Sequence, residues 1–230
     1  MGANKKTARI AGLLYLIVVI TGTFNLGYVP GKLIVWDNAQ ATFNNITASE
    51  TLFRLGIVSG LICYTAFLLL PFVLYSLLKA VNKTGAMLMV ILAAVSVPIS
   101  FVNLLNKFAV LSLIGKAAYL RIFTMAEVQS QVMLHLRYYS NGNQLAQVFW
   151  GLWLFPFGWL VYKSGFLPKI LGMFLMAGCF SYLINFTGEF LFHGYSNTAI
   201  SSYITLPASI GEIGICLWLL IVGIKSKPAQ

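Results

Sequence analysis

The stretch YITLPASIGEIGICLWLLIVGI, residues 203–224, decides the fold class. A helix needs about 20 predominantly apolar residues to cross the hydrocarbon core of a bilayer, and this stretch has that length. Its charged residue, Glu212, lies near the middle. A carboxylate at that depth is costly, so it normally faces a partner or a water-filled cavity rather than lipid. The stretch therefore predicts a transmembrane helix that carries a polar site.

Five further stretches have the same apolar character. The whole chain agrees with them, because 59% of its residues are hydrophobic and 9% are charged, whereas a soluble domain has about 25% charged residues. A soluble all-α protein would need polar helix faces that these stretches lack. We predict an all-α integral membrane bundle forming a single transmembrane domain, residues 1–230. Its six transmembrane helices are expected at residues 10–28, 52–78, 87–113, 145–162, 170–192 and 203–224.

The two longer connections, residues 30–49 and 115–142, each predict a short helix at the membrane surface. Both contain a polar cap residue followed three positions later by Gln or Glu, which is the spacing of a capping box. Apolar residues at helical intervals follow, as in helices that lie in the membrane interface. They are Ala39, Phe43 and Ile46 in the first connection and Met125, Val128, Val132, Leu136 and Tyr139 in the second. The capping-box pairs are Asp37 with Gln40, Thr47 with Glu50, and Thr124 with Glu127.

The basic residues predict the orientation. The net charge of +10 could indicate a nucleic-acid partner in a soluble protein, but here the cations flank apolar runs and act as orientation signals. We expect no nucleic-acid partner, and an N-in, C-in topology with the two longer connections outside. The inner segments then hold Lys5, Lys6, Arg9, Lys79, Lys83, Lys163, Lys169, Lys225 and Lys227. The outer connections hold Lys32, Lys116, Arg121 and Arg137.

This topology places the protein in the cell inner (plasma) membrane as a multi-pass protein. The first apolar run is preceded by basic residues, as in a secretory signal peptide, but no small-x-small cleavage site follows it. We therefore expect the run to be retained as the first transmembrane helix.

Polar residues converge in the outer half of the predicted bundle. Ser96, Ser100, Asn103 and Lys107 recur at intervals of four, three and four, which places them on one helix face. Polar positions on the other helices fall at a similar depth. We predict an outward-facing polar pocket. Its expected lining residues are Arg54, Asn103, Asn106, Lys107, Gln147, Asn185, Glu189 and Glu212.

Lys107 and Arg54 are the expected partners of Glu212 and Glu189, because an unpaired charge within a membrane is expensive. The predicted pocket favours binding of a small or amphiphilic ligand, including a lipid, for transport or sensing. No cofactor is expected, and the sequence does not indicate an oligomeric state.

Two other functions remain open. Glu189 and His193 are four residues apart, so one helix face could present both, with Glu212 or His135 completing a zinc site for metal-assisted hydrolysis. Neither histidine belongs to a recognised metal motif. Alternatively, the protein is a non-catalytic assembly or partner subunit in which polar side chains join the helices by hydrogen bonds.

Four motifs, together with the overall layout, resemble one known family. They are SETLFRLGIV (residues 49–58), NLLN (103–106), SGFLPKILG (164–172) and PASIGE (207–212). The chain resembles a bacterial integral-membrane family catalogued as domain of unknown function 4386, and the resemblance spans nearly the whole chain. It implies a bacterial origin and a six-helix layout, and it brings no established activity, cofactor or catalytic residue.

Overall fold

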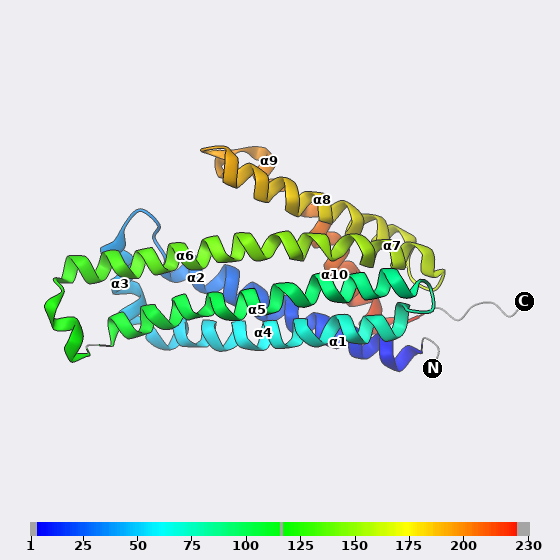
Figure 1. Ribbon diagram of the computed structural model, residues 1–230, viewed down its shortest axis with the longest axis horizontal. Helices are drawn as coiled ribbons and strands as arrows, with labels where there is room; N and C mark the ends of the chain where they lie inside the picture. Colours follow the sequence, from blue (N-terminus) through cyan, green and yellow to red (C-terminus); the bar gives the residue numbers. More distant parts are fainter. Residues whose placement is uncertain (1–3, 116, 225–230) are drawn as a thin grey trace, which may run out of the picture. The chain divides into compact units, whose positions relative to one another are not determined.

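The computed structural model describes residues 4–115 and 117–224 and is helical throughout, with no strand in these ranges (Figure 1). Lys116, Lys225 and Lys227 lie outside the described residues. The elements are α1 (Lys5–Gly22), the π-helical segment η1 (Thr23–Tyr28), α2 (Val29–Leu33), α3 (Ala39–Ala48), α4 (Glu50–Leu78), α5 (Lys83–Ile114), the 3-10 turn η2 (Ala118–Ile122), α6 (Met125–Leu152), α7 (Leu154–Ser164), α8 (Lys169–Leu191), the 3-10 turn η3 (Tyr195–Asn197), α9 (Ala199–Tyr203) and α10 (Leu206–Ile221).

Six helical stretches are long and apolar enough to cross a membrane, which makes the chain a multi-pass membrane protein. They are Lys5–Leu33, Glu50–Leu78, Lys83–Ile114, Met125–Ser164, Lys169–Leu191 and Ala199–Ile221. The predicted number and order of the spans are thereby confirmed for the described residues. The N-in, C-in orientation and the inner membrane stay predictions.

The fourth span differs most from the prediction. The helix expected to lie separately at the membrane surface, within residues 115–142, is the first part of α6 and continues into the span without interruption. The polar residues after Tyr139 therefore do not end the helix. The break falls later, at Trp153, between α6 and α7. Pro156 accounts for its position, because a proline has no N–H to donate to the carbonyl four residues earlier.

The caps at the connections agree with the prediction at one of three places. Thr124 and Glu127 form the expected capping box, in which the Thr124 backbone N–H donates to Glu127 Oε2 at 2.7 Å and the Glu127 N–H donates to Thr124 Oγ1 at 3.3 Å. At α3 the cap is Asn38 rather than Asp37, since Asn38 Oδ1 accepts from the Ala41 N–H. Thr47 caps nothing, because it lies within α3.

The helices are grouped into two compact units, and the chain passes between them several times. Unit 1 comprises Met1–Ile17, Thr65–Val97 and Gln144–Gln230, and unit 2 comprises Val18–Tyr64 and Pro98–Asn143. Several long helices contribute residues to both units. The single domain stays a prediction.

Close helix contacts through glycine organise unit 1. A Cβ on Gly211 of α10 would lie 2.9 Å from the Leu175 backbone nitrogen of α8, and a Cβ on Gly178 would lie 2.8 Å from Ala208 Cα. Gly12 of α1 meets the backbone of α10 in the same way, at Leu220. Small residues let transmembrane helices approach until their backbones touch. Consequently α10 is held tightly against both α1 and α8.

The core of unit 2 is an aliphatic cluster to which five helices contribute. Its members are Val29, Leu33, Ile46, Phe53, Ile57, Val110, Ile114, Val132 and Leu136. Val132 and Leu136 belong to the apolar stripe that was predicted to face a membrane surface, and here they are buried against the neighbouring helices. In Figure 1, α3 lies beside the first turns of α6 at one end of this cluster.

The glycine contacts of α10 predict that alanine substitutions at Gly211 and Gly214 have different effects on stability. Gly211→Ala places a methyl group against the backbone of α8, which cannot move locally, so we expect a loss of about 1–3 kcal/mol in the free energy of unfolding. Thermal unfolding in detergent can be followed with a thiol-reactive dye, because Cys63, Cys179 and Cys216 are all buried.

Gly214→Ala on the same helix is the matched control. Its added methyl group would meet only the end of the Leu171 side chain, at 2.6 Å, and that side chain can rotate away. We expect the control to unfold within a few degrees of the wild type. Equal destabilisation by the two variants would contradict the close packing of α10 on α8.

Candidate functional site

The ammonium group of Lys107 is the most deeply buried charge in unit 2. Lys107 lies on α5 and is 2% exposed. Its Nζ donates to Asn25 Oδ1 at 2.6 Å and to the Asn25 backbone carbonyl at 3.5 Å. It also lies 4.3 Å from the centroid of the Tyr139 ring, within the range of a cation–π interaction. One amide and one aromatic ring therefore form the environment of this cation.

The π-helical segment η1 presents Asn25 to Lys107. In a π-helix the backbone bonds run to the fifth residue, so carbonyl groups and side chains are displaced from their α-helical directions. Both oxygens of Asn25 accept from the same ammonium group, one from the side chain and one from the backbone. Isolated π-helical turns inside α-helices occur frequently at functional sites, and this one lies directly at the buried charge.

A second layer of amides and a phenol holds the two partners of Lys107. Asn25 Nδ2 donates to the Tyr139 hydroxyl at 3.1 Å. Asn103, one helical turn before Lys107, donates to the Tyr139 backbone carbonyl at 2.8 Å and to Asn143 Oδ1 at 3.0 Å. A Cβ at position 142 would collide with the Asn103 side chain, so a larger residue there would displace Asn103 from its hydrogen bonds. The network thus links α5 and α6 side by side.

An open groove on α5 and α6 reaches this network. Its volume is about 480 Å³, and it is lined by Pro98, Ile99, Val102, Asn103, Asn106 and Gly142. The apolar part of its lining includes Val102, which is 66% exposed. The polar part is Asn103 and Asn106, whose side chains are hydrogen-bonded at 3.2 Å. His135 Nδ1 lies 3.3 Å from Asn106 Oδ1 and extends the polar edge.

Glu212 forms a separate polar site in unit 1. The Tyr15 hydroxyl donates to Glu212 Oε2 at 3.1 Å, and the Tyr182 hydroxyl donates to Oε1 at 3.3 Å. Tyr15 is completely buried, beside Trp153 with a ring-centroid separation of 6.2 Å. The glycine contacts described above place Glu212 between these two phenols. Its partners are therefore neutral donors on α1 and α8.

Glu189 also has neutral partners in unit 1. Gln144 Nε2 donates to Glu189 Oε2 at 2.8 Å, and Asn185 Nδ2 donates to Oε1 at 3.0 Å. One turn beyond Gln144, Gln147 has its Oε1 buried without a hydrogen-bond partner. A buried acceptor of this kind costs about 1–3 kcal/mol unless something donates to it.

The eight predicted pocket residues fall into two sets. Arg54, Asn103, Asn106 and Lys107 belong to unit 2, and Gln147, Asn185, Glu189 and Glu212 belong to unit 1. Within unit 2, Asn103 and Lys107 share one network, and Asn106 is bonded to it. Within unit 1, Asn185 and Glu189 are bonded directly. A single pocket formed by all eight residues stays a prediction.

The predicted ion pairs of Arg54 and Lys107 have different outcomes. Arg54 pairs with Glu50, one turn away on α4, at 2.6 Å, and both side chains are largely exposed. This is the ion pair present among the described residues, and sequence reasoning had placed Glu50 in a cap instead. Because Lys107 and Glu212 belong to different units, the pair between them stays a prediction.

The proposed zinc ligands are not arranged as expected. Helix α8 ends at Leu191, so His193 lies in the following turn and does not share a helix face with Glu189. Within the described ranges, no three side chains among His, Cys, Asp and Glu come together as a group that could hold a metal ion. The arrangement of the described residues therefore does not support the metal-assisted alternative with Glu189, His193 and Glu212.

Three tyrosines are the functional neighbours that sequence reasoning missed. Tyr139 had been assigned to the apolar stripe of a surface helix, and Tyr15 and Tyr182 had been assigned to apolar spans. A phenol has both an apolar ring and a polar hydroxyl, so helical periodicity alone cannot distinguish a packing tyrosine from a hydrogen-bond donor.

The comparisons with known proteins identify a family. A family described as "Domain of unknown function (DUF4386)" matches residues 10–223. The chain belongs to this family. An uncharacterised protein of Archaeoglobus fulgidus is 37% identical over 81 residues, which is 35% of this chain and 46% of that protein. The chain thus spans less than half of the curated relative it matches, and no solved structure matches it significantly.

The environment of Lys107 generates a prediction for this member of the DUF4386 family. Asn25→Leu removes the oxygen that accepts from the buried ammonium, so we expect a loss of about 3–5 kcal/mol in unfolding free energy. The double variant Asn25→Leu with Lys107→Met removes the charge as well. We expect it to recover more than half of that loss in the same thiol-dye unfolding experiment.

Asn45→Leu is the matched control in unit 2. Asn45 Nδ2 donates to the Leu33 carbonyl at 3.4 Å, and the loss of one such neutral bond costs about 1 kcal/mol. If Asn25→Leu were no worse than Asn45→Leu, or if the double variant were worse than Asn25→Leu, Asn25 would not be the principal partner of the charge.

Proposed function

We propose that this membrane protein binds a membrane-resident amphiphile with an anionic headgroup, in the groove on α5 and α6, for transport or sensing. The supporting observation is the pairing of an open groove with a buried cation of unit 2 that has only neutral partners within that unit. The apolar lining fits an acyl chain, and the polar edge offers amide groups to a headgroup.

The composition of the groove supports a ligand that is polar at one end. Pro98, Ile99 and Val102 precede Asn103 and Asn106 along α5. A groove that contacted only lipid tails would gain nothing from two asparagines, because polar groups that face hydrocarbon are costly. Asn106 Nδ2 donates to two Asn103 oxygens at 3.2 Å, and a headgroup oxygen would accept from it in their place while the chain contacts the apolar residues.

The sign of the headgroup charge follows from Lys107. The acidic residues among the described part of unit 2 are Asp37, Glu50 and Glu127, and none of them bonds to Lys107. Lys107 is one helical turn from Asn103, about 6 Å along the axis. A negative charge about 10 Å from the ammonium would gain roughly 1.5–2 kcal/mol at an effective dielectric constant near 20. The unit therefore favours an anion in the groove.

If the protein is instead an assembly subunit, the same network has a purely structural role. In that case the bonds among Asn25, Asn103, Lys107 and Tyr139 only join helices, and such bonds contribute about 0.6–2 kcal/mol each. Joining helices does not require a charged side chain, because an amide would serve. The buried ammonium is therefore the feature that favours ligand binding over assembly.

A panel of amphiphiles with one tail and different headgroups tests the proposal. The purified chain in nanodiscs is titrated with laurate, dodecyl phosphate, dodecanol and dodecyltrimethylammonium, and binding is measured by the shift in unfolding temperature. We expect the two anions to stabilise the protein and the cation to have no effect. Asn106→Leu should weaken anion binding by about tenfold, because it removes one headgroup hydrogen bond. Lys107→Met should abolish the preference for anions over dodecanol.

Thr187→Val is the matched control, since Thr187 lines a groove of similar volume, about 400 Å³, in unit 1. It should leave the response to all four compounds unchanged. Equal responses to anion and alcohol in the wild type would contradict the proposal. Retention of the anion preference in Lys107→Met would also contradict it and would favour the assembly role.

A further inference from the structure

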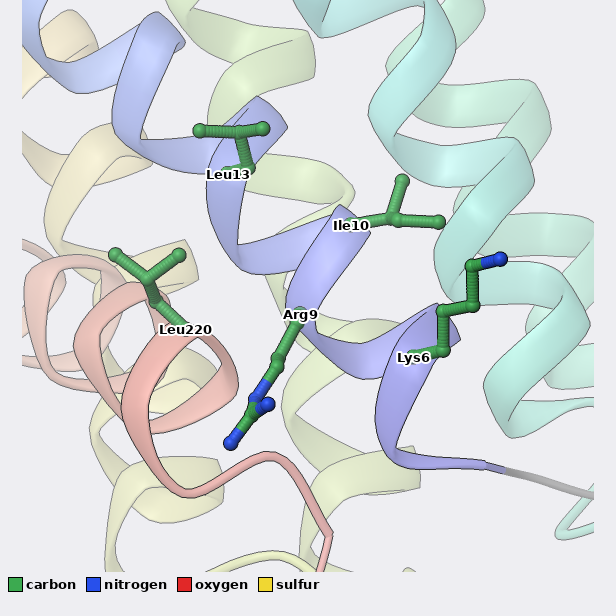
Figure 2. A pocket seen from close by; sticks show the side chains of 5 residues that line it. All are labelled: Lys6, Arg9, Ile10, Leu13 and Leu220. Carbon is green, nitrogen blue, oxygen red and sulfur yellow. The ribbon is translucent and has the colours of Figure 1, made fainter.

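A second groove, on α1 and α10 in unit 1, combines two cations with an apolar wall. It has a volume of about 370 Å³ and is lined by Lys6, Arg9, Ile10, Leu13 and Leu220 (Figure 2). In Figure 2 the Arg9 side chain extends from α1 toward α10, where Leu220 lies, and Lys6 points to the other side of α1. The two cations thus stand on either side of the exposed face of α1.

The groove changes from charged to apolar along the helix axis. Lys6, Arg9, Ile10 and Leu13 are spaced as i, i+3, i+4 and i+7, which places them on one face of α1. From Lys6 to Leu13 the helix rises by about 10 Å. The apolar members are exposed, Ile10 by 43% and Leu13 by 52%. A ligand that matches this face is charged at one end and apolar at the other.

The opposite face of α1 shows that this exposure is not a consequence of loose packing. Ala8, Ala11, Gly12 and Tyr15 are buried, and Cys216 Sγ of α10 lies 3.6 Å from the Gly12 carbonyl oxygen. The close contact at Gly12 fixes the two helices side by side, and Leu220 of α10 lines the groove beside it. The groove is therefore built on a firm part of unit 1.

The two cations have no acidic partner in the described part of the chain, where the ion pair is that of Arg54 with Glu50. The carboxylates of unit 1 are Glu189 and Glu212, and both are bonded to neutral side chains. Lys6 and Arg9 are accordingly available to an external anion. Guanidinium and ammonium groups are the usual ligands of phosphate in proteins.

We infer that this groove binds an anionic phospholipid, with the phosphate between Lys6 and Arg9 and an acyl chain along Ile10, Leu13 and Leu220. A second copy of the chain is a poorer occupant, because the protein carries a net charge of +10 and would bring further positive charge to the groove. In the predicted orientation this end of α1 faces the cytoplasm, where the leaflet is rich in anionic lipids. The lipid is an interfacial ligand, independent of the amphiphile proposed for unit 2.

Native mass spectrometry of the detergent-purified full chain tests the inference. The wild type is titrated separately with dioleoylphosphatidylglycerol, with dioleoylphosphatidylcholine and with glycerol 3-phosphate, which has the headgroup chemistry without the chains. We expect phosphatidylglycerol to bind more tightly than phosphatidylcholine, and glycerol 3-phosphate not to bind. Lys6→Gln with Arg9→Gln should weaken phosphatidylglycerol binding by about 30-fold, since each basic residue near an anionic surface contributes roughly fivefold.

Lys163→Gln with Lys169→Gln is the matched control, because it removes the same charge from exposed residues of unit 1 outside the groove. Phosphatidylglycerol binding should be unchanged in this control, and Arg9→Lys should retain most of the affinity. Leu13→Ala should weaken both phospholipids equally. If the Lys6/Arg9 double variant does not fold by circular dichroism, Arg9→Gln alone carries the comparison, with about a fivefold loss expected. Equal losses in the groove and control variants, or no lipid preference in the wild type, would overturn the inference.

Discussion

The interaction on which unit 2 depends is the one between the Lys107 ammonium and Asn25. An uncompensated charge in an apolar helix bundle costs several kcal/mol, and the structure supplies oxygen acceptors and an aromatic face within one shell. Neighbouring polar residues hold these partners in place. Tyr139 is held by Asn25 and Asn103, and Gly142 leaves room for Asn103. The conformations of η1, α5 and α6 are thus tied to one buried charge.

Each unit holds charged groups by neutral hydrogen-bond partners, and the charges of the two units have opposite signs. In unit 1 the carboxylates of Glu189 and Glu212 receive two neutral donors each, and in unit 2 the ammonium of Lys107 donates to a neutral acceptor. Amides and phenols stabilise a buried charge without neutralising it. The field of such a charge therefore remains available to a ligand, which a charge fully paired with an opposite one would not offer.

Much of this layout could be predicted from the sequence, because apolar length and polar periodicity are local properties. The six spans and the single buried face of Ser100, Asn103 and Lys107 follow from spacing alone. The partners could not be predicted, because they depend on which helices touch. The separate surface helix expected within residues 115–142 is instead the first part of α6, because an amphipathic stripe looks the same whether it faces a membrane interface or a protein core. The π-helical turn at Asn25 has no periodic signature at all.

The π-helical turn has a mechanical consequence. A π-helical turn contains more residues than an α-helical one, so conversion of η1 to α-helix would rotate Asn25 relative to α5 by up to about 100°, the angle of one residue. Both Asn25 oxygens would then move away from the Lys107 ammonium, while the backbone of the segment remained fully hydrogen-bonded. The π-helical turn is therefore the conformation in which one residue brings two oxygens to the buried charge.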